Sequence, residues 1–541
     1  MVAVMAKERL YLFDTTLRDG AQTTGVDFSL EDKRVIVRAL DELGIDYIEG
    51  GYPGANPTDT ELFAAEPELK RATFTAFGMT KRAGRSVAND PGFQATLQAK
   101  AGAVCLVAKA WDYHVRVALG ISNEENLEGV QQSVAAIRQL PGREAMIDCE
   151  HFFDGYKSNR AYALAVANTA YAAGARWVVL CDTNGGTLPH EISAIMAEVA
   201  EHVPGAHLGI HTHNDTENAV ANALAAVRAG ARQVQGALNG LGERCGNANL
   251  TSIIPTLLLK SEFAEQFAIG VSPERLRRLT QASRLLDEIL NRAPNRHAPY
   301  VGEAAFATKA GIHASAILKE PATYEHVPPE SVGNRRRVLV SDQAGKSNLI
   351  YELERLGIPL DKRDERIGRL LEEVKAREAL GYAYEAAEAS FELLARRLLG
   401  EVPQFFTVDS FRVMVEKRHN ALGRLVTVSE ATVKVFINGG EEPLWSVAEG
   451  NGPVHALDQA LRKDLGRYQN VIKDVELVDY KVRILTGGTE AVTRVLVESR
   501  DRGTNERWFT VGVSSNIVDA SFEALIDSIT YKLMKAGAEA V

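Results

Sequence analysis

The stretch that decides the fold covers residues 30–51 and reads LEDKRVIVRALDELGIDYIEGG. Apolar residues recur along Leu30–Leu43 with the spacing of a helix that buries one face. Gly44 follows, where a glycine supplies the left-handed turn that closes a helix. The short run Tyr47–Glu49 then has the character of a buried strand. The stretch therefore predicts a helix that leads through a tight turn into a strand.

The same alternation of helix and strand extends over the first half of the chain. Gly174 and Gly230 stand between a helix-like and a strand-like segment just as Gly44 does. Eight strand–helix units within about 250 residues are typical of a TIM barrel, a (β/α)8 fold. A doubly wound open sheet is the alternative, but it would not need eight strands. The predicted strands are Tyr11–Phe13, Tyr47–Glu49, Thr73–Phe77, Ala103–Val107, Ala145–Cys149, Trp177–Cys181, His207–His213 and Gln233–Ala237.

The residue pattern changes twice along the rest of the chain. Prolines interrupt residues 291–329, and residues 349–399 are strongly helical. From about Phe405 onward, β-branched and alternating runs predict strands, with helices at Pro453–Leu465 and Asp519–Ala536. We expect an α/β protein with a catalytic barrel at 1–290, helical linker subdomains at 291–400 and an α+β domain at 401–541. The last domain should contain two strand–helix repeats that serve dimerisation or ligand sensing.

Composition excludes several classes of function. A net charge of −10 over 541 residues argues against a nucleic-acid or anionic-membrane partner. The four cysteines form no CxxC pair, which excludes a zinc ribbon and fits free thiols in a reducing cytoplasm. Cys245 is expected to be a small buried thiol rather than a nucleophile. No apolar stretch approaches the ~20 residues that span a bilayer, so we expect a cytoplasmic protein.

Polar residues follow six of the eight predicted strands. In a TIM barrel the active site lies at the carboxyl ends of the strands, so these residues should share one rim. The residues in question are Asp14–Gly20, Glu49, Glu150-His151, Asp182-Thr183, His211–Asp215 and Asn239–Asn247.

His211 and His213 form the most specific candidate metal-binding motif in the sequence. Side chains two apart on a strand point to the same side, so both imidazoles can reach one ion while Thr212 faces away. Opposite Asp19, they form a mixed nitrogen and oxygen donor set that suits Mn, Co, Zn or Mg. Asn247 could add a fourth protein ligand.

Three charged residues are candidates for the chemistry beside this metal. Arg18 could stabilise an alkoxide that develops when a ketone is attacked. Glu150 and Glu243 are candidates for proton transfer, although strand-end carboxylates also anchor metal ligands.

Taken together, three motifs resemble the acyl-CoA condensing branch of the DRE-TIM metallolyase family. The motifs are Asp14-Thr15-Thr16-Leu17-Arg18-Asp19-Gly20, His211-x-His213-Asn214-Asp215 and Gly242-Glu243-Arg244-Cys245-Gly246-Asn247. This branch contains the 2-isopropylmalate, homocitrate and citramalate synthases. The resemblance implies an acyltransferase that joins acetyl-CoA to a 2-oxo acid in a metal-dependent Claisen condensation and then hydrolyses the thioester. A metal-dependent acyl-CoA lyase and a non-catalytic amino-acid sensor are the other candidates.

The resemblance also implies roles for individual residues. Asp19, His211, His213 and Asn247 would be the metal ligands and Arg18 the catalytic arginine. Glu150 and Thr183 would line the keto-acid pocket. His313, in Ala310-Gly311-Ile312-His313, and Tyr324 would serve acetyl-CoA activation or thioester handling. Because that segment reaches into the partner subunit's site in relatives, a homodimer is expected.

Two departures from the family pattern bear on the substrate. Ala21 and Glu217 stand where many isopropylmalate and homocitrate synthases have glutamate and glycine. With the segments Glu49–Gly54, Trp111–Val115 and His151–Gly155, they resemble the citramalate synthase subgroup. The expected keto acid is therefore pyruvate. The expected effector at the last domain is isoleucine, the amino acid to which citramalate leads.

Overall fold

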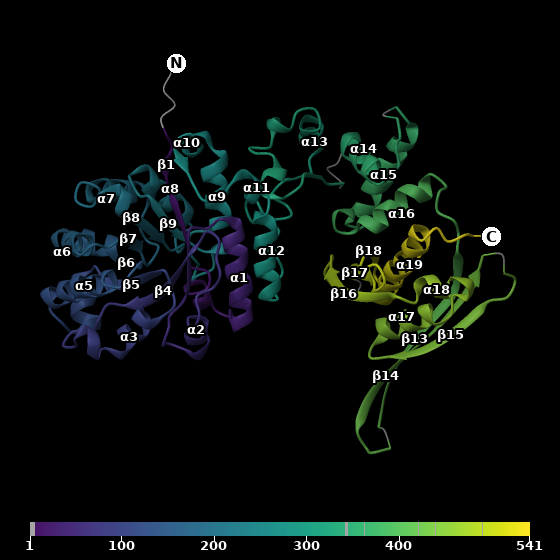
Figure 1. Cartoon of the computed structure of the whole chain (residues 1–541). Helices are drawn as coiled ribbons and strands as arrows, with labels where there is room; N and C mark the ends of the chain where they lie inside the picture. Colours follow the sequence, from purple (N-terminus) through teal and green to yellow (C-terminus); the bar gives the residue numbers. More distant parts are fainter. Residues whose placement is uncertain are drawn as a thin grey trace. The chain divides into compact units, whose positions relative to one another are not determined.

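The computed structural model describes residues 6–340, 345–361, 363–419, 421–438, 440–488 and 491–540. These residues form two compact units (Figure 1). One unit contains the chain up to Phe306 together with Glu325–Arg336. The other contains Ala307–Tyr324 and the chain from Arg337 onward.

The first unit is built on a closed barrel of eight parallel strands, which confirms the predicted TIM barrel. Strand β2 closes the barrel by pairing with β3 on one side and with β9 on the other. Each predicted strand is present within one or two residues of its expected ends. The barrel strands are β2 (Tyr11–Asp14), β3 (Tyr47–Gly51), β4 (Thr73–Met79), β5 (Ala103–Lys109), β6 (Glu144–Glu150), β7 (Trp177–Asp182), β8 (Leu208–Thr212) and β9 (Gln233–Gly236).

Local signals place the helices that connect these strands. Helix α1 begins after Ser29, which forms a capping box with Asp32, and ends at Gly44, whose φ of 100° is left-handed. Helix α6 is kinked at Asn159, which departs from the helical backbone and whose side chain accepts from the Tyr162 N–H. The other connecting helices include α2 (Pro57–Leu62), α3 (Pro91–Gln98), α5 (Asn123–Arg138), α6 (Phe152–Ala172), α7 (Pro189–Val199), α8 (Ala219–Arg228) and α9 (Leu250–Leu259), and α1 is Leu30–Leu43.

Alternation along the strands separates two cores. Leu10 and Leu12 pack outward against the helices, whereas Tyr11 and Phe13 point into the barrel. The interior is filled mainly by aromatic and sulfur-containing side chains, including Trp177. The unit also contains β1 (Glu8–Arg9), β10 (Phe267–Ala268), α10 (Ser261–Ala264), α11 (Pro273–Leu276) and α12 (Leu279–Ile289).

The second unit begins with short elements around a small helical core. Strands β11 (Ala307–Thr308) and β12 (Arg337–Val338) pair, and α13 (Gly311–Ile317) lies between them in sequence. The helical stretch expected at 349–399 consists of three helices, α14 (Lys346–Arg355), α15 (Glu365–Ala379) and α16 (Glu388–Leu398).

Two antiparallel sheets, each followed by a helix, complete this unit and confirm the predicted repeat. Helices α17 and α19 pack on their own sheets and on each other. Strand β15 gives a weak sequence signal, because the small residues Ser446 and Ala448 take its more buried positions while Trp445 and Val447 are exposed. The elements are β13 (Phe406–His419), β14 (Leu425–Ile437), β15 (Leu444–Gly450) and α17 (Pro453–Lys463), then α18 (Gln469–Ile472), β16 (Val475–Ile484), β17 (Thr493–Asp501), β18 (Arg507–Ser514) and α19 (Ile517–Lys535). Each described helix is too short or too polar to cross a bilayer.

Candidate metal centre and active site

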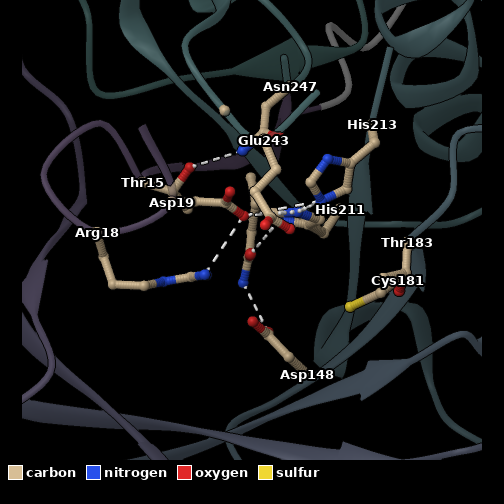
Figure 2. Close-up of polar contacts among 12 residues, drawn as sticks. Thr15, Arg18, Asp19, Asp148, Cys181, Thr183, His211, His213, Glu243 and Asn247 are labelled. Carbon is tan, nitrogen blue, oxygen red and sulfur yellow. Dashed lines mark hydrogen bonds and ion pairs between the residues drawn. The ribbon is translucent and has the colours of Figure 1, made fainter. Parts of the chain in front are cut away.

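The polar residues predicted at the strand ends lie on the carboxyl rim of the barrel. Arg18 and Asp19 follow β2, His211 and His213 lie at the end of β8, and Asn247 belongs to the loop after β9. In Figure 2, Arg18 lies on one side of the Asp19 carboxylate and the two histidines on the other. Residues more than 190 positions apart in the sequence therefore meet at one point.

Three side chains present donor atoms to a common point. His211 Nε2 lies 3.2 Å from His213 Nε2, and Asp19 Oδ2 lies 3.4 Å and 3.8 Å from these two nitrogens. Donors that bind one ion at 2.0–2.2 Å stand roughly 3 Å apart when they are at right angles. All three side chains are buried. This geometry fits the donor set of a divalent metal ion.

Unsatisfied buried atoms support the same fit. Asp19 Oδ1 and Asn247 Oδ1 are buried acceptors without a hydrogen-bond partner. Leaving a buried polar atom unpaired costs about 1–3 kcal/mol, and an ion would satisfy such acceptors. Asn247 is held beside the histidines by a backbone bridge to His213. The close approach of Gly242 also fixes it, since a Cβ there would lie 2.4 Å from Asn247 Oδ1.

A buried chain of hydrogen bonds orients His211. Asp148 Oδ1 accepts from Gln235 Nε2 at 2.9 Å, so the Gln235 Oε1 atom faces His211 Nδ1, also at 2.9 Å. Because an amide oxygen only accepts, Nδ1 of His211 carries a proton, and Nε2 is the atom that faces Asp19 and would bind a metal ion. Gln235 and Asp148 were not among the predicted site residues, although the alternation of β9 and β6 indicates that both point inward.

The electrostatics of the cluster keep Asp19 ionised and His213 neutral. Burial opposes the charge of Asp19, but Arg18 and the two histidines hold the pKa of this carboxyl well below its usual range. Burial and the neighbouring His211 lower the pKa of His213 to about 3. Burial also disfavours a charged His211, yet its interaction with Asp19 raises its pKa. The arrangement presents a carboxylate beside imidazoles, as metal binding requires.

Arg18 is fixed on three sides. Its Nε donates to Glu49 Oε2 at 2.7 Å, and its Nη1 lies 3.3 Å from Asp19 Oδ2. The guanidinium carbon lies 4.0 Å from the centre of the Phe77 ring. Burial disfavours the charge, but the carboxylates of Glu49 and Asp19 raise the pKa of Arg18. Burial raises the pKa of Glu49, and the Arg18 guanidinium counters that shift. A permanent cation therefore stands beside the candidate metal ligands.

Glu150 and Thr183 lie at the ends of β6 and β7. The Glu150 carboxylate forms an ion pair with Lys109 at the end of β5, a residue that was not among the predicted site residues. Thr183 Oγ1 accepts a hydrogen bond from the backbone N–H of His151 at 2.8 Å. Both contacts fix side chains that could line a substrate pocket.

The loop after β9 differs from expectation at one residue. Cys245 is exposed, so the prediction of a buried thiol was wrong. The loop turns outward because Arg244 lies at a positive φ of 55° and pairs with Asp215 at 2.7 Å. Glu243 is about half exposed, with its nearest cation, Arg244, at 3.6 Å.

His313 and Tyr324 belong to the second compact unit. His313 is exposed at the start of α13, and its ring centre lies 4.4 Å from that of Tyr324. Tyr324 is 50% exposed. The two residues predicted to act together therefore lie side by side, but in a different unit from the metal ligands.

We predict that Gln235→Leu weakens divalent-metal binding by about 10–100-fold, because His211 loses the acceptor that fixes its ring. Isothermal titration of the metal-free protein with Mn²⁺ and metal analysis of the purified protein measure the effect. Gln233→Leu is the matched control, since Gln233 is buried two residues earlier on the same strand and touches no candidate ligand. Equal metal affinity in the two variants would contradict the role of Gln235.

Comparison with known proteins places this architecture in one family. Residues 9–282 match the HMGL-like family, residues 300–380 match the homocitrate synthase post-HMGL domain-like family, and residues 385–533 match the LeuA allosteric (dimerisation) domain. The chain is 49% identical to the (R)-citramalate synthase of Aquifex aeolicus over 99% of both chains.

Two further relatives differ in their sequence identity to this chain. The (R)-citramalate synthase of Geobacter sulfurreducens is 50% identical over 97% of this chain and 98% of its own. A 2-isopropylmalate synthase of Ruminiclostridium cellulolyticum is more distant, at 30% identity over 97% and 98% of the two chains. The chain accordingly belongs to the (R)-citramalate synthase family of HMGL-like enzymes.

Proposed function

We propose that this chain catalyses the condensation of acetyl-CoA with pyruvate to give (R)-citramalate and free coenzyme A. The observation that carries the proposal is the buried donor set of Asp19, His211 and His213 beside the Arg18 guanidinium. Identity of 49–50% to relatives named (R)-citramalate synthase supports the choice of product.

A bound divalent ion would act as a Lewis acid toward the ketone and carboxylate of the keto acid. Asp19, His211, His213 and Asn247 would hold it, with Mn, Mg, Zn or Co as the candidate metals. Arg18 donates to the ketone oxygen as the new carbon–carbon bond converts that oxygen to an alkoxide. Because Arg18 is already fixed by Glu49 and Phe77, it need not reorganise during the reaction.

The remaining residues handle protons and the thioester. A base removes a proton from the acetyl methyl group, and the resulting carbanion forms a bond to the ketone carbon of pyruvate. The alkoxide then takes up a proton, and water cleaves the thioester to release the thiol of coenzyme A. Glu150 and Thr183 are proposed to line the keto-acid pocket, while Glu150, Glu243, His313 and Tyr324 are the candidates for proton transfer and thioester handling.

We expect pyruvate to exceed 2-oxoisovalerate by a factor on the order of 100 or more in kcat/KM, since each apolar carbon that misfits a closed pocket costs ~1–3 kcal/mol. Free-thiol release from acetyl-CoA, measured with pyruvate, 2-oxobutyrate, 2-oxoisovalerate and 2-oxoglutarate, provides the comparison.

Each other result would identify a different function. Preference for 2-oxoisovalerate would indicate a 2-isopropylmalate synthase, and preference for 2-oxoglutarate a homocitrate synthase. Thiol release with none of the acids would leave an acyl-CoA lyase or a non-catalytic sensor. Cleavage of a hydroxyacyl-CoA would distinguish the lyase from the sensor.

We also propose a division of labour among residues 1–290, 291–400 and 401–541, with catalysis in the first and regulation and dimerisation in the last. The match of residues 385–533 to an allosteric dimerisation domain supports this division. The proposed site takes His313 and Tyr324 from the partner subunit of a homodimer. Four free cysteines are compatible with a reducing cytoplasm.

A subunit-mixing experiment tests the shared site. Arg18→Gln and His313→Ala subunits should each be nearly inactive as homodimers, because each lacks one half of every site. A heterodimer purified through two different affinity tags should regain about half of the wild-type activity, since it contains one complete site. A heterodimer as inactive as its parents would show that each site is built from a single chain.

The last domain is proposed to bind isoleucine, with leucine as the second choice. A separate regulatory domain typically changes affinity or rate through a coupling of about 1–3 kcal/mol. Full-length enzyme should therefore be inhibited by isoleucine, and a chain that ends at Gly400 should bind metal but escape inhibition. Initial rates against isoleucine concentration measure the inhibition of the full-length and the truncated chain. Equal inhibition of the two chains, or none by any branched-chain amino acid, would contradict the regulatory role.

A further inference from the structure

Lys33 is a buried cation that takes no part in the site described above. It lies on α1 and is only 4% exposed. Its ammonium group donates to the backbone oxygens of Leu17 and Gly50, both at 2.9 Å, and forms an ion pair with Asp59. A lysine has three such protons, so its hydrogen-bonding capacity is fully used. A buried lysine that donates two hydrogen bonds to backbone oxygens restrains those backbone segments.

Asp59, on α2, completes the arrangement from the other side. Its carboxylate accepts from the Tyr52 N–H at 2.9 Å and from Asn56 Nδ2 at 3.0 Å. Gly51 makes room for it, because at a φ of 147° a Cβ would lie only 2.4 Å from the Asp59 carboxyl carbon. The backbone after β3 is thus packed directly onto the partner of Lys33.

The two backbone oxygens that Lys33 holds are next to the Arg18–Glu49 ion pair. Leu17 immediately precedes Arg18, and Gly50 immediately follows Glu49. Arg18 Nε in turn donates to Glu49 Oε2 at 2.7 Å. One ammonium group therefore ties the loop after β2 to the end of β3. Loss of that tie would remove one restraint from each of the two backbone segments that carry the pair.

We infer that Lys33, held by Asp59, is a positioning residue that sets the guanidinium of Arg18 beside the candidate metal ligands. The inference rests on the proposed role of Arg18 as the group that stabilises the alkoxide. The buried Lys33–Asp59 ion pair would keep the Arg18 guanidinium in the position from which it can contact the reacting ketone.

The variant that tests this inference is Lys33→Met/Asp59→Asn. Lys33→Met alone would leave the Asp59 carboxylate buried without a counter-charge and could unfold the barrel. The double variant removes both charges, keeps the volume, and leaves an amide oxygen that can accept from the Tyr52 N–H. Only the grip on the Leu17 and Gly50 oxygens is lost.

The chain offers a matched control at the opposite end of the same strands. Arg9 donates to the backbone oxygens of Leu10 and Ala268 and pairs with Asp46, so it also joins a cation to two carbonyls and one carboxylate. Arg9 precedes β2 and Asp46 precedes β3, far from the carboxyl rim. Arg9→Met/Asp46→Asn therefore loosens the barrel without touching the loop that carries Arg18.

We expect kcat of Lys33→Met/Asp59→Asn to fall by about 10–100-fold, because a misplacement near 1 Å can cost this much. KM for the keto acid should change little, since an alkoxide contact is made only in the transition state. In an Arg18→Gln background the same double substitution should cause no further loss, because it acts through the side chain already removed. The Arg9→Met/Asp46→Asn control should leave kcat unchanged relative to its own background, whether that background is wild type or Arg18→Gln.

Two results would overturn the inference. One is a kcat of the Lys33/Asp59 variant equal to that of the Arg9/Asp46 control. The other is a full additional loss in the Arg18→Gln background, which would indicate a general structural effect. Rates are measured with the 2-oxo acid that wild-type enzyme prefers. An error in the proposed substrate would thus appear in the wild-type profile, whereas an error in the inference would appear only in the comparison of variants.

Discussion

The burial of the Asp19 carboxylate is the constraint on which the site depends. A carboxylate removed from water must be compensated, and it is compensated here by the Arg18 guanidinium and two imidazoles within 3.3–3.8 Å. A closed barrel of parallel strands makes this possible, because it brings the ends of β2 and β8 to one rim. The same compensation yields a donor set that suits a divalent ion with a fixed cation beside it.

His211 and Arg18 each have a further buried partner behind them. His211 requires Gln235 and Gln235 requires Asp148, while Arg18 requires Glu49. Buried polar groups are costly unless each has its partner, so a rigid site of this kind extends several residues into the barrel interior. Lys33 and Asp59 are a further buried pair, in which each charge has its partner. Arg18 and His211 are therefore each held by a buried partner, as a site that relies on electrostatic stabilisation requires.

The two compact units differ in how their polar residues are arranged. Those of the barrel include the buried set of Asp19, His211 and His213 at the carboxyl rim. The second unit instead pairs two sheets with two helices, and His313 stands exposed beside Tyr324. An exposed histidine and tyrosine gain a defined chemical environment only when another surface covers them. This fits the proposal that they complete a site on a partner subunit.

The sequence alone determined the barrel, its strands and the residues at its rim, because helix and strand periodicity, glycine stops and the strand-end rule are local properties. It therefore identified Arg18, Asp19, His211 and His213 correctly as neighbours. Only the tertiary structure decided the partners of these residues. Gln235, Lys109 and Lys33 look like ordinary strand or helix residues in sequence, and their roles arise from groups that contact them across strands and helices. The exposure of Cys245 was likewise decided by the Arg244–Asp215 pair, a long-range contact that no local pattern encodes.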